Sequence, residues 1–221
     1  MTLKQKAGYI WDYYKVHIII GIIVIYAVTS FIHGKLTEKQ TVFRLVMIDS
    51  NVTELIEDSF LDGFAGELDS FDPDREQMIL DADYDLDSRG FGAYSTEQLI
   101  LAEYNVGSID GTVAPEEEIR SLAGTQAFGD LNELLPHEIM EKIALRDIEV
   151  LRIRYEDPAT GEVHEYPFAV NISSSPCIQS GFTDAMGNTI SYYDKDCYYA
   201  ISPNSSNLEN SIAFLEYLLV Y

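Results

Sequence analysis

The chain has 221 residues, 47% of them hydrophobic, and a formal net charge of −23. This length suits one domain of ordinary size plus an appendage, and the apolar content excludes wholesale disorder. The charge is unevenly divided, with a net +3 over residues 1–40 and a net −26 over residues 41–221. Because so acidic a body would repel phosphate backbones, we expect no nucleic-acid partner.

An apolar segment near the N-terminus, Val16 to Ile32, contains no Lys, Arg, Asp or Glu. At about 1.5 Å per residue it spans roughly 25 Å, slightly less than the ~30 Å hydrocarbon layer of a bilayer. Aromatic rings at its start favour the headgroup level, and lysines before it favour a cytoplasmic N-terminus, so we expect membrane lipid as its partner. The aromatic residues are Tyr9, Trp11, Tyr13 and Tyr14, and the lysines are Lys4, Lys6 and Lys15.

Three interpretations of this segment are a core helix, a cleaved signal peptide and an uncleaved signal anchor. A core helix would show a polar face, which is absent between Ile18 and Ile25. A signal peptide fits the basic start and the apolar middle, but Ala27-Val28-Thr29 is a poor cleavage site. No Cys follows directly for lipid attachment, so we favour a single-pass anchor in the cell membrane. The expected organisation is a cytoplasmic N-terminus over 1–15, a transmembrane helix over 16–33, a linker over 34–41 and an extracellular domain over 42–221.

Strands and helices alternate beyond the linker, as in an α/β domain. Runs of β-branched and apolar residues predict strands, and apolar residues at helical spacing predict helices. Ser206 and Glu209 have the spacing of a capping box for the last helix. In chain order the expected elements are a strand over 42–49, a helix over 51–68, a strand over 77–86, a helix over 95–104, a strand over 108–114, helices over 115–124 and 135–147, a hairpin of strands over 149–157 and 162–172, a strand over 197–202 and a helix over 206–219.

Three stretches taken together resemble extracellular solute-binding proteins. They are LILAEYNVGSIDGTVAPEEEIRSLAGTQAFGDLNELL (99–135), GEVHEYPFAVNI (161–172) and CYYAISPNSSNLENSIAFLEYLL (197–219). The first is similar to a helix, an Asp-bearing strand and a second helix of that family, the second to its crossing strand, and the third to its closing strand and helix. The chain, which opens with YIWDYYK (9–15), also resembles small membrane-anchored surface proteins of Firmicutes. The resemblance implies a periplasmic-binding-protein-like α/β fold of the second type.

One departure from that family concerns its second lobe. Complete members have two lobes that close over a ligand, whereas the segment 173–196 is too short for a full second lobe. The resemblance therefore implies a reduced domain with a shallow groove in place of a closed cleft, which weakens burial of a small ligand.

Two motifs resemble metal sites in part. DADYDLD (81–87) alternates carboxylates as a calcium loop does. A calcium loop also needs Gly at its sixth position and Glu at its twelfth, and the sequence does not supply both, whether the loop is counted from Asp81 or from Asp85. HEIME (137–141) ends in Glu where a metalloprotease helix has its second His. No nucleophile motif is present either. We therefore expect a protein that is not an enzyme, with no metal site and no cofactor.

Cys177 and Cys197 are the only cysteines of the chain. In an extracellular domain a disulfide between them would restrain the short segment where a second lobe is missing. Two separate buried thiols are the alternative, and the sequence leaves both open.

A ligand in an open α/β sheet binds outside the carboxyl ends of the strands. This rule points to Ser50 and Asn51 after the first strand and to Asp110 near the third. Four tyrosines would offer stacking faces, or would lie half-buried in strands, and they are Tyr192, Tyr193, Tyr198 and Tyr199.

The expected function is that of a membrane-anchored extracytoplasmic binding protein of solute-binding type, without catalysis, whose partner is a small solute or an envelope protein. The alternative is a cell-envelope interaction or scaffold protein that retains the fold and binds no small solute.

Overall fold

The computed structural model describes residues 13–17, 19–30, 39–52, 60–84, 86, 91–156, 161, 163–183 and 186–220, and of residues 83, 91–94, 155 and 156 the backbone only. The chain divides into two compact units, Met1–Gln40 with Pro73–Arg75, and Thr41–Asp72 with Glu76–Tyr221. The first contains the apolar segment and the second contains the α/β body.

One apolar helix, Tyr13–Ser30, lies in the first unit. Its 18 residues have a mean hydropathy of 1.6 and none of them is buried, so by length and composition it could cross a membrane. The Thr29 hydroxyl donates to the Ile25 carbonyl oxygen at 2.8 Å, which satisfies this polar group within the helix. The predicted helix over 16–33 is confirmed as an apolar helix up to residue 30, and residues 31–33 lie outside the described part.

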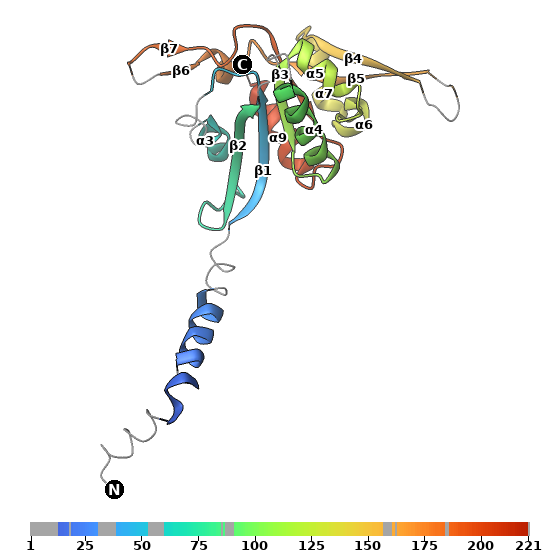
Figure 1. Ribbon diagram of the computed structural model, residues 1–221. Helices are drawn as coiled ribbons and strands as arrows, with labels where there is room; N and C mark the ends of the chain where they lie inside the picture. Colours follow the sequence, from blue (N-terminus) through green and yellow to red (C-terminus); the bar gives the residue numbers. More distant parts are fainter. Residues whose placement is uncertain are drawn as a thin grey trace. The chain divides into compact units, whose positions relative to one another are not determined.

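The body is built on a six-stranded mixed sheet with the strand order β2-β1-β3-β8-β5-β4 (Figure 1). β1 and β3 are parallel, β8 is antiparallel to both β3 and β5, and β4 and β5 form an antiparallel hairpin. Hydrogen bonds from Gln40 N to Arg75 O and from Asp49 N to Tyr84 O advance in the same direction along both strands, so β2 is parallel to β1. The strands of this sheet are β1 (Gln40–Ile48), β2 (Glu76–Tyr84), β3 (Gly111–Pro115), β4 (Val150–Glu156), β5 (Val163–Asn171) and β8 (Cys197–Ile201), while β6 (Phe182–Thr183) and β7 (Thr189–Ile190) pair separately.

Helices cover both faces of this sheet. They are α3 (Asp62–Glu67), α4 (Phe91–Asn105), α5 (Glu116–Ala123), α6 (Leu131–Leu134), α7 (His137–Leu145), α8 (Pro176–Gln179) and α9 (Leu208–Leu218). Successive residues of β1 face opposite sides, as the pleat of a strand requires. Leu45 and Met47 pack with residues of α3, α7 and α9, whereas Val46 and Ile48 pack with residues of α4 and α5. The body therefore has three layers, α, β and α.

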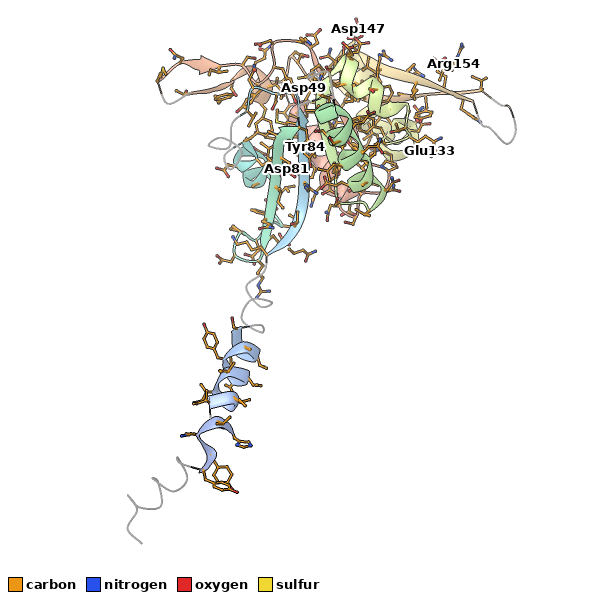
Figure 2. All side chains as sticks on the ribbon, viewed as in Figure 1. Asp49, Asp81, Tyr84, Glu133, Asp147 and Arg154 are labelled. Atoms are coloured by element: carbon orange, nitrogen blue, oxygen red, sulfur yellow. The ribbon has the colours of Figure 1, made fainter. Side chains whose placement is uncertain are left out.

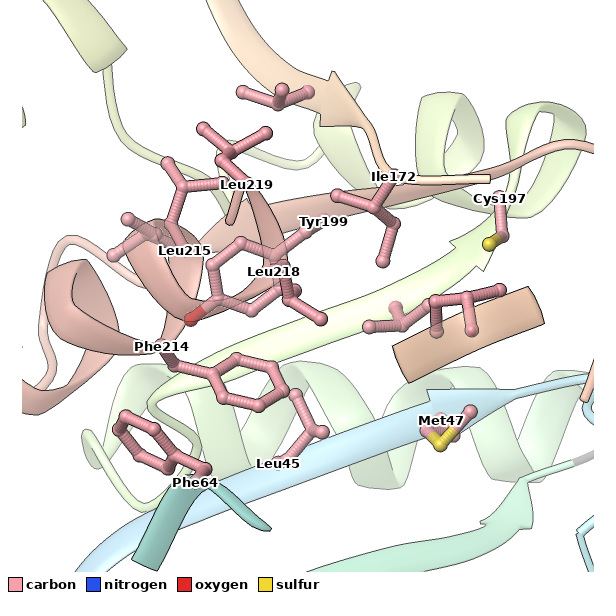
Figure 3. Packing of buried hydrophobic residues seen from close by; sticks show 14 of the residues in the cluster. Leu45, Met47, Phe64, Ile172, Cys197, Tyr199, Phe214, Leu215, Leu218 and Leu219 are labelled. Carbon is pink, nitrogen blue, oxygen red and sulfur yellow. The ribbon is translucent and has the colours of Figure 1, made fainter. Parts of the chain in front are cut away.

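Aromatic rings fill the core between β1, β8 and α9 (Figure 3). The ring of Phe214 on α9 lies 5.0 Å from that of Phe43, 5.0 Å from that of Phe64 and 5.4 Å from that of Tyr199. All four side chains are at most 1% exposed. Such edge-to-face and tilted contacts add to the stabilisation from buried apolar area, and they join the C-terminal helix to the first strand of the body.

The predicted elements agree with the observed ones at most positions. The mixed α/β class is confirmed, and so are all six long strands and the helices α4, α5, α7 and α9. The helix predicted over 51–68 is described only from residue 60 onward, where α3 is helical, because residues 53–59 lie outside the described part. The sequence did not predict α6, α8, β6 or β7, which are all four residues or shorter. The predicted capping box is wrong, since Asn207 is the N-cap of α9 and its side chain makes no cap bond.

Candidate functional site

The candidate site is the edge of the sheet at which the parallel strands end. β1 ends at Ile48 and its parallel neighbour β3 ends at Pro115. The chain passes from β1 to β2 on one side, then returns to β3 on the other side of β1. This reversal makes the gap between β1 and β3 a topological switch point, where open α/β sheets bind ligands. We call this region the carboxyl-end edge and define it by residues 49–51, 116–118 and 191–196.

Ser50 and Asn51 lie at this edge, as the sequence indicates, and both are engaged by the backbone. The Asn51 N–H donates to the Tyr192 carbonyl oxygen at 2.9 Å, and its side-chain amide donates to the Ser191 carbonyl oxygen at 3.1 Å. The Ser50 hydroxyl accepts from the Val52 N–H at 3.4 Å. Asn51 therefore holds the loop before β8 against the end of β1, and Ser50 closes the local turn.

Asp110 lies at the opposite edge of the sheet, because it immediately precedes β3. Its side chain is 2% exposed, and its carboxylate accepts from the Arg44 N–H at 2.7 Å, the Ser205 hydroxyl at 2.5 Å and the Asn207 amide at 3.1 Å. These bonds tie the start of α9 to the sheet. The structure therefore does not bring Asp110 together with Ser50 and Asn51, since Asp110 precedes β3 whereas Ser50 and Asn51 follow its parallel neighbour β1.

Tyr193 occupies the switch point itself. Its hydroxyl donates to the Val113 carbonyl oxygen at 2.9 Å, and its side chain is only 7% exposed. Burial is the main reason why the pKa of Tyr193 lies well above its ordinary value, and the neighbouring charges of Asp49 and Glu118 raise it further. Tyr193 is thus a neutral donor at every physiological pH, and its hydroxyl bonds the backbone of β3.

Two carboxylates flank this ring. Asp49 follows β1 with a positive φ of 49°, a left-handed conformation that Asp tolerates better than most residues. Its carboxylate accepts from the Leu86 N–H at 2.6 Å, and it lies at the end of β1 in Figure 2. Glu118, in the first turn of α5, is 7% exposed, and its Oε2 has no hydrogen-bond partner within the described part of the chain. Burial raises the pKa of Glu118, and repulsion from Asp49 raises it further.

Two shallow cavities open beside Lys195 in the loop before β8. One of about 450 Å³ is lined by Glu118 together with Lys195 and Asp196, and one of about 380 Å³ is lined by Tyr193 and Ser173 together with the same loop. Lys195 is exposed, and its charge opposes the rise of the Glu118 pKa. Glu118 and the exposed Lys195 therefore line the larger of these two cavities together.

A further cavity of about 730 Å³ lies between α3, α7, α8 and α9. Its walls are mostly apolar, and three of its four charged side chains are engaged by protein. Lys142 pairs with Glu216 at 3.0 Å, and Arg146 donates to the Leu219 carbonyl oxygen. The size is within the range of small-molecule sites, but no buried polar group of this cavity lacks a partner among the described residues.

The two cysteines are free thiols, so the disulfide considered from the sequence is not formed in this structure. Cys197 is fully buried at the start of β8 and Cys177 is partly buried in α8. Burial raises the pKa of Cys197 to about 12 and also raises that of Cys177. Both thiols are therefore protonated and poorly nucleophilic at neutral pH.

The four tyrosines considered for ligand stacking are core residues. Tyr192, Tyr193, Tyr198 and Tyr199 are between 0% and 7% exposed. Their rings pack within the protein, for example Tyr192 against Phe60 at 4.9 Å. Sequence reasoning missed Glu118 and Lys195 as residues of the edge, and it considered Tyr193 only as one of four stacking faces. The signal for Glu118 was present, because the same carboxyl-end rule points past Pro115 into the acidic start of α5.

The arrangement as a whole is suited to binding through carboxylate acceptors. Among the described residues no group of three or more His, Cys, Asp or Glu side chains could hold a metal ion. The protein is thus a three-layer α/β protein with a candidate site at the switch point of its sheet. It also has an N-terminal apolar helix. The chain matches no protein-family model, no curated protein and no solved structure.

Proposed function

We propose that the protein is a membrane-anchored extracytoplasmic binding protein of solute-binding type, without catalysis, and that its ligand binds at the carboxyl-end edge. The observation that carries the proposal is Glu118, a residue only 7% exposed whose buried Oε2 atom has no partner among the described residues. A buried acceptor without a donor is unfavourable unless a ligand or ordered water supplies one. It lies at the position where open α/β sheets bind ligands.

The mixed topology supports a reduced form of the type 2 periplasmic-binding fold. β8 comes from the far C-terminal part of the chain and inserts antiparallel between β3 and β5. In the segment from 173 to 196 the described elements are only α8 and the short β6–β7 pair. A domain of this kind would hold its solute on an open edge, with affinity in the weak range because little ligand surface becomes buried.

The apolar helix and the charge distribution support the proposed location. The helix Tyr13–Ser30 is long and apolar enough to span a bilayer, and positive charges gather before it. Short positive flanks remain in the cytoplasm, so the acidic body would be outside the cell. Protease added to intact cells should remove the body and leave an N-terminal fragment in the membrane. Protection of the body on intact cells, with cleavage only after lysis, would contradict this orientation.

Solute capture can be tested with the full-length protein in detergent micelles or nanodiscs. Thermal melting is followed in the presence of neutral sugars, amines, carboxylates, short peptides and divalent cations. The proposal predicts a rise of the melting temperature with at least one class, which Glu118→Gln removes or weakens. Glu133→Gln, an exposed acid on α6, is the matched control. A flat response to all five classes would count against solute binding.

The second candidate is a cell-envelope interaction or scaffold protein that keeps the fold and binds no small solute. The observation that favours it is Tyr193, whose buried ring already fills the switch point. A photoreactive amino acid in place of the exposed Lys195, activated on intact cells, separates the two candidates. One discrete cross-linked envelope protein together with a flat solute screen favours the scaffold.

A further inference from the structure

The two edge strands of the six-stranded sheet are β2 and β4, which stand at opposite ends of the strand order. An edge strand presents backbone N–H and C=O groups for pairing, and proteins protect such edges with charged side chains, Pro or a covering element. β4 is protected, because Arg152 and Arg154 are exposed on it and the Arg120 guanidinium donates to the Arg152 carbonyl oxygen at 3.1 Å. In β2, by contrast, residues 77–80 carry neither a charge nor a Pro.

A cavity of about 310 Å³ lies beside this part of β2. Each of the four residues 77–80 lines it, and its other wall is formed by α3 and the residues that flank this helix. Figure 1 shows α3 next to β2 at the end of the sheet. The residues of the second wall are Leu61, Asp62, Ala65 and Phe71. We call this space, bounded by a strand and a helix, the β2 cavity.

The β2 cavity runs along the edge of the strand and is not confined to one face of the sheet. Successive side chains of a strand point to opposite faces. Met78 and Leu80 pack with the core cluster on the α3 side. Gln77 and Ile79 point to the other side, where the Gln77 amide donates to the Thr41 hydroxyl at 3.1 Å and Ile79 lines a separate cavity. Since residues of both faces line the β2 cavity, it lies at the backbone edge that they share.

The shape of such a site selects an extended chain as its occupant. The backbone groups of β2 repeat with the spacing of a strand, so a second strand can pair with them along its length. The side chains of that added strand would alternate between the two faces of the sheet. On the α3 face they would meet Leu61, Ala65 and Phe71, which favours apolar residues at every second position.

Charge decides between the partners that could supply this strand. Asp62 is exposed, and among the described residues it is the one charged side chain that lines the β2 cavity. Residues 60–80 carry six acids against one cation, Arg75. A second copy would bring an equally acidic edge against this one, and like charges opposite each other on paired strands are destabilising. A basic segment would instead have the complementary charge.

We propose that the edge of β2 is a docking site for an extended segment of a partner protein, which alternates apolar and basic residues and adds to the sheet as a further strand beside α3. This site takes a protein partner, so it is separate from solute binding at the carboxyl-end edge.

Calorimetric titration of the full-length protein in nanodiscs of zwitterionic lipid tests the site with synthetic peptides. The probe is acetyl-GKVRVKVG-amide, and acetyl-GEVEVEVG-amide is the control of opposite charge. We expect the basic peptide to bind at least ten-fold more tightly than the acidic one.

Backbone pairing is tested with two further versions of the basic peptide, one N-methylated on its valines and one on its basic residues. Alternate N–H groups of a strand point to opposite edges. We therefore expect one methylated version to lose at least ten-fold in affinity and the other to keep its affinity. Attraction between charges alone would treat the two versions alike.

Substitutions in the second wall test where the peptide binds. Ala65→Phe places a ring in the β2 cavity and should weaken binding of the basic peptide at least ten-fold, whereas Ala144→Phe, at an exposed position of α7, should leave it unchanged. Asp62→Lys reverses an exposed charge and should weaken binding several-fold, with Glu133→Lys on α6 as its matched control. The melting temperature of each variant checks its folding, and the exposed Asp62 position keeps the test valid if Ala65→Phe does not fold.

Three results would overturn the proposal. The first is equal binding of the basic and acidic peptides, or equal binding of the two methylated versions. The second is unchanged binding of the basic peptide in both Ala65→Phe and Asp62→Lys. The third is a wild-type dimer in detergent micelles, measured by sedimentation, that Ala65→Phe converts to a monomer, because it would assign the edge to a second copy of the chain.

Discussion

The hydroxyl of Tyr193 donates a 2.9 Å hydrogen bond to the carbonyl oxygen of Val113, and this bond joins the loop before β8 to the middle of β3. Both residues are buried, so the bond lies in the interior of the body. It holds the Tyr193 side chain against β3, and Tyr193 also lines the 380 Å³ cavity. The body thus has the carboxyl-end edge of an open α/β sheet, with Tyr193 held at the place where the strand order reverses.

Substitution Tyr193→Phe tests this bond. We expect a loss of about 1–2 kcal/mol in the free energy of unfolding, because the Val113 carbonyl loses a buried donor while the ring still fills the gap. Urea denaturation of the full-length protein in mild detergent measures it. An unchanged unfolding midpoint would show that the hydroxyl contributes nothing to closure of the switch point.

Substitution Asp110→Asn tests whether this buried carboxylate stabilises the fold. The amide cannot accept from all three donors that now bind the carboxylate, so we expect a loss of about 2–3 kcal/mol in stability, the range for bonds to a charged group. Asp69→Asn, at an exposed turn, should change stability by less than about 0.5 kcal/mol. Loss of solute binding in Asp110→Asn, with the fold intact, would instead return Asp110 to the ligand site.

Substitution Glu118→Gln should raise stability at neutral pH. Burial raises the pKa of Glu118 above its ordinary value of 4.5. The folded state therefore holds this proton more tightly, and the stabilisation is present below pH 4.5 and lost as the pH rises through the folded pKa. Melting temperatures at pH 7 and pH 4 should show a stabilised variant at pH 7 and a smaller difference at pH 4. The exposed neighbour Glu117→Gln controls for removal of one charge, and a variant less stable than the wild type at pH 7 would contradict the expectation.

A matched pair of leucines tests the core between α9 and the sheet. Leu218 is fully buried and Leu145 is 86% exposed. Leu218→Ala should lower the free energy of unfolding by about 2–5 kcal/mol because it removes apolar contacts and leaves a cavity. Leu145→Ala should change it by less than about 0.5 kcal/mol. Similar effects of the two substitutions would contradict the packing of α9 against β1 and β8.

Membrane insertion requires that the centre of the helix Tyr13–Ser30 carries no charge. An Arg at Ile23, near the middle of Tyr13–Ser30, should disfavour insertion by about 3 kcal/mol. Carbonate extraction of cell membranes should move much of the Ile23→Arg protein into the soluble fraction, whereas Ile23→Leu should stay in the pellet. Retention of both variants in the membrane to the same extent would mean that another segment holds the protein there.

The order of elements could be predicted because it depends on short-range patterns. The run of apolar residues in β1 and the Pro and acids that open α5 are local signals, and the structure places both elements within two residues of the expected bounds. Short pieces such as α6 and α8 could not be predicted, because four residues carry too little periodicity to distinguish a helix from a turn.

The candidate site was predictable only in part. Ser50 and Asn51 follow a strand whose end the sequence marks clearly, and they do lie at the carboxyl-end edge. Asp110 does not lie there, because it precedes β3, whereas the rule for open α/β sheets points to residues that follow the carboxyl end of a strand.

The sequence by itself determined the apolar N-terminal helix, the acidic body and its α/β class, since hydropathy, charge and periodicity act over neighbouring residues. Only the tertiary structure decided the strand order, the insertion of β8 beside β3, and the meeting of Tyr193, Asp49 and Glu118 at one switch point. The physical reason is that burial and the pairing of polar groups depend on contacts between residues far apart in the chain. The bond between Tyr193 and Val113 spans 80 positions, and no local pattern specifies it.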